Sequence, residues 1–375
     1  MAWIPNQMYV KRRNTLMVLD LIAQSQSVSR TQLVDLTELS PASITRIVGE
    51  LICLGLVKEE GTFDLAQRGR KARILKTNGD GLYTVAICVE PKRLLISLID
   101  FHHHFLYRAE APLGEGDAAS PEALASLSKA LYDSMDRTII ADWSRVRVAG
   151  ISVPGLVDGI QGVVIKSDQM DWTNQDLRTP FERALDMPVW LENDAKACLV
   201  GEQARMNIRQ EDTAYLLVGD GVGCAVMSNG KLLRGHRNMA GEIEHLNLMP
   251  GLLPEDVLQA HLTEQGILHS AQTASPSVCT LDDLMIAYRQ NAGFARILVE
   301  DVLQYLRLVL AMIDSFYDPT HIILGGATAH KLREALDPLF RDPRLCVGGD
   351  NEAACMLGAS IGGISCALDA LLDEQ

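Results

Sequence analysis

A loop with three glycines lies between two apolar segments in the stretch YLLVGDGVGCAVMSNG at 215–230. The apolar pattern predicts strands at 213–218 and 224–227, followed by an Asn-Gly hairpin turn. Rossmann sites and P-loops place their glycines between a strand and a helix, so that the helix N-terminus meets a phosphate. A loop between two strands excludes both motifs, and Asp220 adds a negative charge where a phosphate would lie.

Charge is divided unevenly along the 375 residues. Residues 1–76 contain 11 Lys and Arg against 7 Asp and Glu, a net charge of +4, whereas the whole chain carries −14. A basic module on an acidic body predicts a polyanionic partner for the module alone. The eight cysteines form no C-x-x-C pair, and no signal peptide or membrane-length apolar run is present. These features predict a cytoplasmic protein without membrane association.

The segment SRTQLVDLTELSPASITRIVGEL at 29–51 has the pattern of two short helices joined by a tight turn. Ser29 with Gln32 forms a capping box for the first helix. Ser40 followed by Pro41 starts the second helix. One face of that helix is apolar and consists of Ile44, Ile47, Val48 and Leu51. With the basic hairpin that follows, the pattern predicts a winged helix-turn-helix domain over residues 1–76.

The exposed side of the second helix and the basic hairpin are predicted to contact DNA. Small and polar side chains allow a helix to approach base edges closely. Arginines beside a glycine suit a narrow minor groove. The candidate DNA-contacting residues are Ser40, Ala42, Ser43, Thr45, Arg46, Arg68, Arg70 and Lys71. The alternative is a helical protein-interaction module with a solvated basic loop.

Beyond residue 76 the pattern changes to strands and helices that alternate in two successive sets, which predicts a two-lobed α/β body. The first lobe is expected at 77–194, joined by a C-terminal helix at 355–375. The second lobe is expected at 195–354 and is expected to carry the oligomer contacts. Within the lobes, helices are predicted at 121–140 and 294–316.

Three consecutive histidines at 102–104 suggest a metal-binding tract. They fall between two predicted strands, where a hairpin connection is expected. Consecutive side chains in such a segment point to different sides. The sequence therefore favours a plain connection over a metal site.

Four stretches of the body resemble the ROK family, which contains sugar kinases and sugar-responsive repressors. They are GISVPGLVDGIQGVV, PVWLENDAKACLVGE, VGDGVGCAVMSNGKLLRGHRNMAGEIEH and IILGGATA. With the intervening spacing they cover nearly all of 80–375. The segment at 29–51 is similar to the winged helix of the family's repressors, which the family's kinases lack. The resemblance implies an actin-like sugar-kinase fold for the body.

The resemblance also implies a sugar site. In the family, an END tip presents Asn and Asp to the sugar hydroxyls, and the Asp is the general base in kinases; these residues are Asn193 and Asp194 here. Such groups suit a polyol, because paired hydrogen bonds reject analogues that lack a hydroxyl. A purely structural alternative is that Asn193 and Asp194 cap the following helix.

Further sugar contacts follow from the family's E-x-G-H motif. Glu242 and His245 match it, although Glu244 replaces the glycine. Glu255 is the nearest substitute for another sugar-contacting glutamate of the family. The alternative for His245 is a hydrogen-bonded interior histidine. The family's zinc-binding cysteine cluster is absent, so no metal is expected.

Two stretches depart from the phosphate-binding motifs of family kinases. The Asp-x-Gly-Gly-Thr turn reads CVEPKR at 88–93, where Pro91 lacks an N–H that could face a phosphate. Asp220 occupies a position that is usually small and polar, and its carboxylate would repel phosphate. Kinase activity is therefore not expected, and no cofactor is implied.

Together these features predict a transcriptional regulator, most simply a repressor, that binds operator DNA as a homodimer or homotetramer. Its ROK body would sense a sugar or sugar phosphate. The first alternative is an ATP-dependent ROK sugar kinase with a fused DNA-binding module. The second is a scaffold that binds no small ligand.

Overall fold

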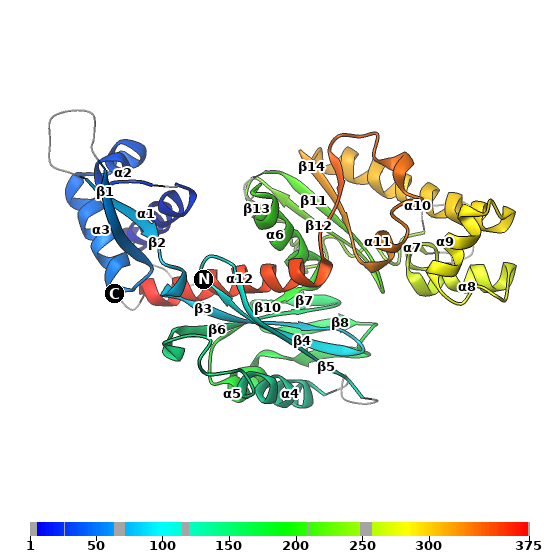
Figure 1. The fold of residues 1–375 in the computed structure, drawn as a ribbon, viewed down its shortest axis with the longest axis horizontal. Coiled ribbons are helices and arrows are strands. Elements are labelled where there is room, and N and C mark those ends of the chain that lie inside the picture. Colours follow the sequence, from blue (N-terminus) through cyan, green and yellow to red (C-terminus); the bar gives the residue numbers. More distant parts are fainter. Residues whose placement is uncertain are drawn as a thin grey trace.

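The computed structural model describes residues 6–25, 27–63, 72–114, 120–208, 211–247 and 257–373. An N-terminal domain of helices and a hairpin is followed by two α/β lobes, as the sequence predicted (Figure 1). The last helix, α12 (Asn351–Asp373), runs from between the lobes to the N-terminal domain. This arrangement gives the molecule one helix in contact with all three parts.

The N-terminal domain is a three-helix unit with a two-stranded antiparallel hairpin. Its elements are α1 (Asn6–Gln24), α2 (Arg30–Thr37), α3 (Pro41–Cys53), β1 (Val57–Phe63) and β2 (Ala72–Thr77). The predicted capping box of Ser29 and Gln32 is present, and Ser40 caps α3 ahead of Pro41. The predicted apolar stripe of α3 is buried. Its core continues into Ile364, Ala367 and Leu368 of α12.

The first lobe is built on a mixed five-stranded sheet in the order β10-β6-β3-β4-β5. Its strands are β3 (Tyr83–Val89), β4 (Arg93–Asp100), β5 (Phe105–Pro112), β6 (Val146–Val153) and β10 (Val189–Asn193). A small sheet of β7 (Leu156–Asp158), β8 (Val163–Ser167) and β9 (Trp172–Asp176) lies beside it. Alternate residues of β3 face opposite cores: Val85 and Ile87 pack with α4 (Pro121–Asp133) and α5 (Arg178–Leu185), whereas Ala86 packs with α12.

The helix predicted at 121–140 is shorter than expected and ends at Asp133. Just beyond it, the carboxylate of Asp136 accepts hydrogen bonds from the backbone N–H and the hydroxyl of Thr138. Such local bonds offer the backbone an alternative to the helical ladder. The apolar residues after Asp133 therefore pack from a loop and not from a helix.

The second lobe has a five-stranded sheet in the order β13-β12-β11-β14-β15. Its strands are β11 (Thr213–Val218), β12 (Val222–Ser228), β13 (Lys231–Leu232), β14 (His321–Gly325) and β15 (Leu345–Val347). The helices of this region are α6 (Asp194–Met206), α7 (Leu258–Leu262), α8 (Glu264–Ala274), α9 (Leu281–Arg289), α10 (Gly293–Tyr317) and α11 (Ala327–Lys331). The glycine loop joins antiparallel β11 and β12, as predicted, with Gly219 N–H donating to Gly221 O at 3.0 Å.

Close backbone contacts hold α12 between the lobes. A Cβ at Gly150 of β6 would lie 2.0 Å from the carbonyl oxygen of Ala359, and a Cβ at Gly358 would lie 1.8 Å from that of Ala197. Only glycine permits such an approach. Among the described residues, α12 is the one helix long and apolar enough to cross a membrane, and just over half of that apolar window is buried inside the protein.

Candidate functional site

Two adjoining cavities lie between the lobes and share Gln169, Asp194, Leu217 and Gly221 in their walls. We call the first the END cavity, because Asn193 and Asp194 of the END tip line it; its empty volume is about 430 Å³. The second, of about 1110 Å³ and partly open to solvent, is lined by the β3–β4 and β11–β12 turns and is called the hairpin cavity. Asp194 lies where the two meet.

The END tip is formed where β10 ends and α6 begins. The side-chain oxygen of Asn193 accepts a hydrogen bond from Lys196 N–H at 3.1 Å, so the helix-capping alternative is confirmed for Asn193, whereas Asp194 is the first residue of α6. The amide nitrogen of Asn193 donates to Gly155 O and to Asp194 Oδ1, both at 2.9 Å. These bonds fix both side chains of the tip at the wall of the cavity, so capping and ligand contact are compatible.

Asp194 has an unusual electrostatic environment. Its Oδ1 accepts hydrogen bonds from Asn193 and from Ala195 N–H, and the second bond favours the ionised form. Burial nevertheless raises the pKa of Asp194 to about 8, and the nearby carboxylates of Glu242 and Glu244 act in the same direction. The environment therefore favours the protonated carboxyl group, a form that can donate a hydrogen bond into the cavity.

The loop between β13 and α7 brings Glu242 to the END cavity. Two cationic side chains fix this loop: Arg234 pairs with buried Glu192 at 2.5 Å, and Lys196 Nζ donates to Asn238 O at 3.0 Å. Burial raises the pKa of Glu242, whereas the charge of Lys196 lowers it. The cluster therefore holds a partly desolvated carboxyl group next to a cation.

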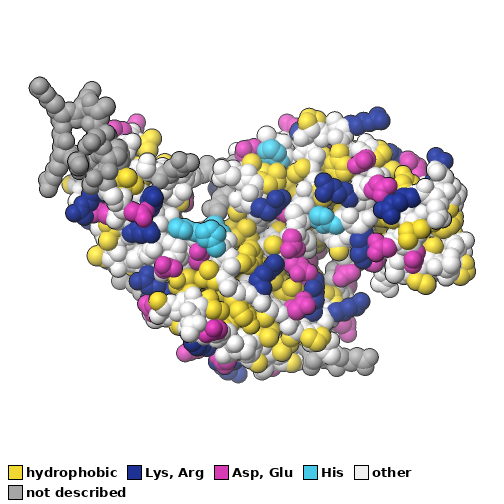
Figure 2. Space-filling model, in the orientation of Figure 1, with side chains coloured by type: hydrophobic (Ala, Val, Ile, Leu, Met, Phe, Trp, Pro, Cys, Tyr) yellow, Lys and Arg dark blue, Asp and Glu magenta, His cyan; other side chains and the backbone are white. Residues whose placement is uncertain are grey.

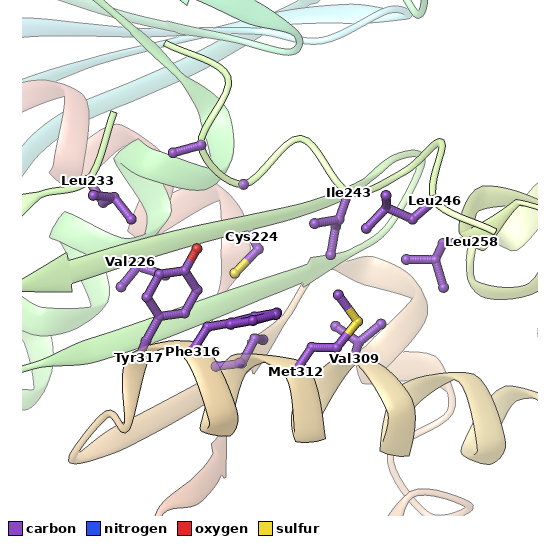
Figure 3. Close-up of a pocket in the computed structure, with 13 residues that line it drawn as sticks. Cys224, Val226, Leu233, Ile243, Leu246, Leu258, Val309, Met312, Phe316 and Tyr317 are labelled. Atoms are coloured by element: carbon purple, nitrogen blue, oxygen red, sulfur yellow. The ribbon is translucent and has the colours of Figure 1, made fainter. Parts of the chain in front are cut away.

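The same loop has an apolar side that faces a separate cavity in the second lobe. Figure 3 shows Ile243 and Leu246 of the loop across from Met312, Phe316 and Tyr317 of α10, with Cys224 and Val226 of β12 between them. This apolar cavity has an empty volume of about 640 Å³. Alternating side chains thus send Glu242 and Glu244 to the END cavity and Ile243 to the apolar cavity.

His245 lies beside the END cavity and not in the protein interior. Its side chain is 57% exposed, and its Nε2 lies 3.1 Å from Asp168 Oδ2 and 3.5 Å from Glu244 Oε1. The interior-histidine alternative is therefore wrong. Burial raises the pKa of Glu244, and the charge of His245 lowers it. Asp168, Glu244 and His245 together have the ligand types of a metal site.

Asp168 and Gln169 line the END cavity but were missed by the sequence reasoning. They lie in the turn between β8 and β9, and a Cβ at Gly221 would lie 2.3 Å from Gln169 Nε2. The amide of Gln169 therefore contacts the glycine loop directly. A polar SDQ tip after the apolar run at 163–165 was the available signal.

The hairpin cavity brings together the two stretches that the sequence analysis compared with the phosphate-binding motifs of family kinases. Glu90 and Pro91 of the β3–β4 turn and Asp220 of the β11–β12 turn line it, with Asp350 and Glu352 from the start of α12. Figure 2 shows acidic side chains gathered in the middle of this face of the molecule.

The arginine that lines the hairpin cavity is already paired. Arg93 donates to Glu90 at 2.7 Å and to Glu110 at 3.1 Å, and it also pairs with Glu352. Burial raises the pKa of Glu90, and Arg93 opposes the shift. The cavity therefore presents several carboxylates to a ligand and one arginine that three of the neighbouring carboxylates engage.

The predicted DNA-contacting residues of α3 lie together on its exposed side. Ala42, Thr45 and Arg46 are exposed, and Ser40 Oγ lies 2.9 Å from Ser43 Oγ. Thr45 Oγ1 donates to Pro41 O at 2.8 Å and keeps its lone pairs available. Arg46 forms no ion pair within the described part of the chain. A free guanidinium thus stands on the helix surface that a duplex would meet.

For the hairpin after α3, the structure describes the strands β1 and β2 and not the residues between them. Arg73 of β2 and Arg30 of α2 both pair with Glu59 of β1, and the hydrogen bond from Arg30 is the largest cause of the lowered pKa of Glu59. Arg68, Arg70 and Lys71 lie outside the described residues, as does Glu255. Their predicted contacts with DNA and sugar stay predictions.

The sequence of the chain matches a protein family and is similar to those of named regulators. The ROK family model matches residues 117–340. A xylose repressor of Caldicellulosiruptor bescii is 24% identical over 361 residues, which span 88% of this chain and 89% of the repressor. The DNA-binding transcriptional dual regulator NagC of Escherichia coli K12 is 25% identical over 342 residues, which span 87% of this chain and 83% of NagC.

Solved structures show the same fold. A ROK family transcriptional regulator, homologous to the E. coli MLC protein, superposes with a TM-score of 0.79 over 98% of both chains, at 22% identity. A ROK hexokinase from Thermus thermophilus superposes with a TM-score of 0.63 at 24% identity; it matches over its whole length but covers 77% of this chain. The fold is thus a two-lobed, actin-like sugar-kinase body with an N-terminal winged helix. The chain belongs to the ROK family.

Proposed function

We propose that the protein is a sugar-responsive transcriptional regulator, most simply a repressor, without kinase activity. One observation carries the proposal: the hydrophobic core of the winged helix continues into α12, and the same helix lines the cleft between the lobes. Ile364, Ala367 and Leu368 pack in the winged-helix core, whereas Asn351 and Cys355 line the hairpin cavity. The N-terminal domain and the cleft between the lobes therefore share one structural element, which lines the cleft on the side of the hairpin cavity.

Operator DNA is the proposed partner of the N-terminal domain. The module is basic while the chain as a whole is acidic, and α3 exposes small polar residues and Arg46. Both sequence relatives described above are named as DNA-binding regulators or repressors. A helix-turn-helix module usually reads two half-sites, so we propose a homodimer or homotetramer. A cytoplasmic location follows for a protein with this partner.

A sugar or sugar phosphate is the proposed ligand of the END cavity. Asn193, Asp194 and Glu242 line this cavity together with Asp168 and Gln169. Carboxyl and amide groups in one small cavity match the donors and acceptors of a polyol. His245 and Glu255 are proposed as additional contacts from the same loop. Xylose and N-acetylglucosamine are the first sugars to try, because repressors of those names are similar to this chain.

Phosphoryl transfer is not part of the proposal, because a nucleotide would meet Glu90, Asp220, Asp350 and Glu352 in the hairpin cavity. Charge repulsion opposes phosphate binding at such short range unless a cation intervenes. The competing function is an ATP-dependent sugar kinase that uses Asp194 as the base. Incubation with ATP, magnesium and a panel of sugars decides between them, and turnover that Asp194→Asn abolishes would overturn the proposal.

Coupling between the two sites would pass through α12. Its 23 residues span about 35 Å at 1.5 Å per residue, from the cleft to the winged helix. A sugar that binds better to one relative arrangement of the lobes shifts the population toward it and moves the helix with them. Such a shift would change the spacing of the two DNA-binding modules in the oligomer.

The DNA contact is tested by footprinting the purified protein on genomic fragments and by measuring affinity for the recovered site. Arg46→Ala should weaken specific binding by about 1–3 kcal/mol if the arginine contacts a base. Arg70→Ala should act mainly on sites with A·T-rich flanks. Arg296→Ala, an exposed arginine on α10, serves as the control. Wild-type footprints for both module variants would show that the DNA-reading surface lies elsewhere.

The sugar response is tested on the same DNA site. Titration with xylose, glucose and N-acetylglucosamine should change operator affinity for at least one sugar and raise the melting temperature of the protein. If no sugar alters either quantity, the protein is a DNA-binding scaffold without this ligand. The neighbouring genes at footprinted sites then guide the choice of further sugars.

A further inference from the structure

Three metal-ligating side chains meet at the junction of the winged helix and the first lobe. Asp100 ends β4, and His102 and His104 lie in the connection to β5. Each residue offers a ligand atom within 4.8 Å of the other two. The histidines do form the expected connection, but the expectation that they point apart is wrong for two of them. His103 has a φ of 67°, and this turn brings His102 and His104 together.

Hydrogen bonds already orient the candidate ligands. Asp100 is buried, and its Oδ1 accepts from the backbone N–H of His104 at 2.8 Å. Its Oδ2 lies 3.0 Å from His104 Nδ1. His102 Nε2 lies 3.0 Å from Thr77 Oγ1 in β2. When Nε2–H donates to Thr77, the Nδ1 lone pair of His102 is left for a metal, and metal-bound histidines are usually oriented through such a second bond.

Gly79 leaves open the space beside these atoms. A Cβ at this position would lie 3.0 Å from His102 Nδ1 and 3.3 Å from Asp100 Oδ2. The two ligand atoms therefore approach the same small volume from different segments. Gly79 starts the short η1 helix (Gly79–Gly81) that links the winged helix to the first lobe, and its carbonyl accepts a hydrogen bond from Phe101 N–H at 3.1 Å.

We propose that Asp100, His102 and His104 bind a divalent transition metal, with Zn²⁺ the best match. Two imidazoles, one carboxylate and a water are a common donor set for zinc, with nitrogen and oxygen atoms about 2.0–2.2 Å from the metal. The two histidines are exposed, so their rings can close the remaining distance. Figure 2 shows histidine surface between the N-terminal domain and the body.

Metal binding would fix the linker between the DNA-binding module and the body. Thr77, Gly79 and Phe101 surround the site, and they belong to the module, the linker and the lobe in turn. A bound ion would hold His102, and with it the contact between His102 and Thr77, at a junction where the winged-helix core also packs on α12. The proposal of a metal site does not rest on the proposed DNA-binding function, because the experiment below measures metal binding and not DNA binding.

The experiment uses the full-length protein without a histidine tag, stripped with a chelator and titrated with Co²⁺. One equivalent should bind with visible d–d absorption and without the intense bands of thiolate ligands, and Zn²⁺ should displace it. His102→Ala and His104→Ala should each weaken Co²⁺ binding at least about tenfold. Gly79→Ala, which leaves all three ligands in place but fills the adjacent space, should weaken it as well.

Two controls separate this site from others. His269→Ala removes an exposed histidine on α8, and His245→Ala removes the histidine of the Asp168 and Glu244 group; both should leave the Co²⁺ spectrum and affinity unchanged. Zn²⁺ should raise the melting temperature of the wild type and not that of His102→Ala. If His102→Ala and Gly79→Ala bind Co²⁺ as the wild type does, or if His245→Ala abolishes binding, the proposal is wrong.

Discussion

The END cavity and the hairpin cavity meet at Asp194 but present different sets of polar groups. The END cavity combines carboxyl groups with the amides of Asn193 and Gln169. Besides the shared Asp194 and Gln169, the hairpin cavity has four carboxyl groups, the amide of Asn351 and an arginine that is already paired. A neutral polyol can bond to the first, whereas a nucleotide phosphate meets repulsion in the second. Two parts of one cleft can thus present different groups to a ligand.

The largest effect is expected for a substitution of Gly241, which lines the END cavity. Its φ is +93°, and a Cβ there would lie 1.6 Å from the carbonyl oxygen of Cys224. The backbone N–H of Cys224 donates a hydrogen bond to the carbonyl oxygen of Gly241 at 2.9 Å. The oxygen that the Cβ would meet is a backbone atom and cannot rotate away. Gly241→Ala must therefore displace the loop that carries Glu242. We expect sugar affinity to fall by at least about 100-fold in calorimetric titrations, a loss of ~2.7 kcal/mol.

Gly235→Ala is the matched control for this change. Gly235 also has a positive φ, +72°, but a Cβ there would be 3.5 Å from its nearest neighbour. The two variants therefore share the backbone strain and differ in the clash. Equal sugar affinities for both would show that the loop position does not control the END cavity.

Glu242→Gln tests the polar half of the comparison more gently. The change keeps the shape of the side chain but removes a partly desolvated carboxyl group near Lys196. Sugar binding should weaken by about 10–100-fold, in line with 1.5–3 kcal/mol for a hydrogen bond to a charged group. Glu90→Gln in the hairpin cavity should leave sugar affinity unchanged. If both variants lose sugar affinity, the two cavities act as one binding site and the contrast between them is wrong.

Asp194 predicts a pH dependence of stability. Its pKa is about 8 in the folded protein against an ordinary value of 3.8, so between about pH 4 and 8 the folded chain holds a proton that the unfolded chain has lost. The stability that Asp194 confers therefore falls as the pH rises through this range. Asp194→Asn, which mimics the protonated acid, should gain stability relative to the wild type from pH 6 to 9.

Denaturant unfolding at several pH values measures this gain, which should be on the order of 1–3 kcal/mol. Asp158→Asn, in the same lobe but outside both cavities, controls for the general effect of removing a carboxylate. A stability difference for Asp194→Asn that does not change with pH would mean that the carboxylate is ionised in the folded protein.

The smallest expected effect concerns Asp220 in the hairpin cavity. Asp220 is exposed, so water screens its charge. Wild-type protein should show no thermal shift with millimolar ADP and magnesium. Asp220→Asn combined with Glu90→Gln should increase nucleotide affinity by no more than a few-fold, since Pro91 still lacks an N–H. Strong ADP binding by the wild type would contradict the contrast between the two cavities.

The sequence predicted best those features that depend on neighbours along the chain. The capping box at Ser29, the start of α3 at Ser40 and the buried stripe of α3 follow from spacings of three and four residues, and all were confirmed. The strand-to-strand setting of the glycine loop was confirmed for the same reason. The helix after Pro121 was predicted to be longer than it is, because the hydrogen bond from Thr138 N–H to the carboxylate of Asp136 competes with the helical ladder.

Features that depend on distant segments came from the tertiary structure alone. Asp168 and Gln169 of the β8–β9 turn line the same cavity as Asp194, and no local pattern in the sequence predicts that arrangement. The meeting of His102 with Thr77 and Gly79 likewise depends on how the hairpin packs against the linker. Short-range patterns therefore determined the elements, and motifs carried the resemblance to the family. The raised pKa of Asp194 and the contacts of α12 with the winged helix were decided by packing, since burial and proximity exist only once the lobes are assembled.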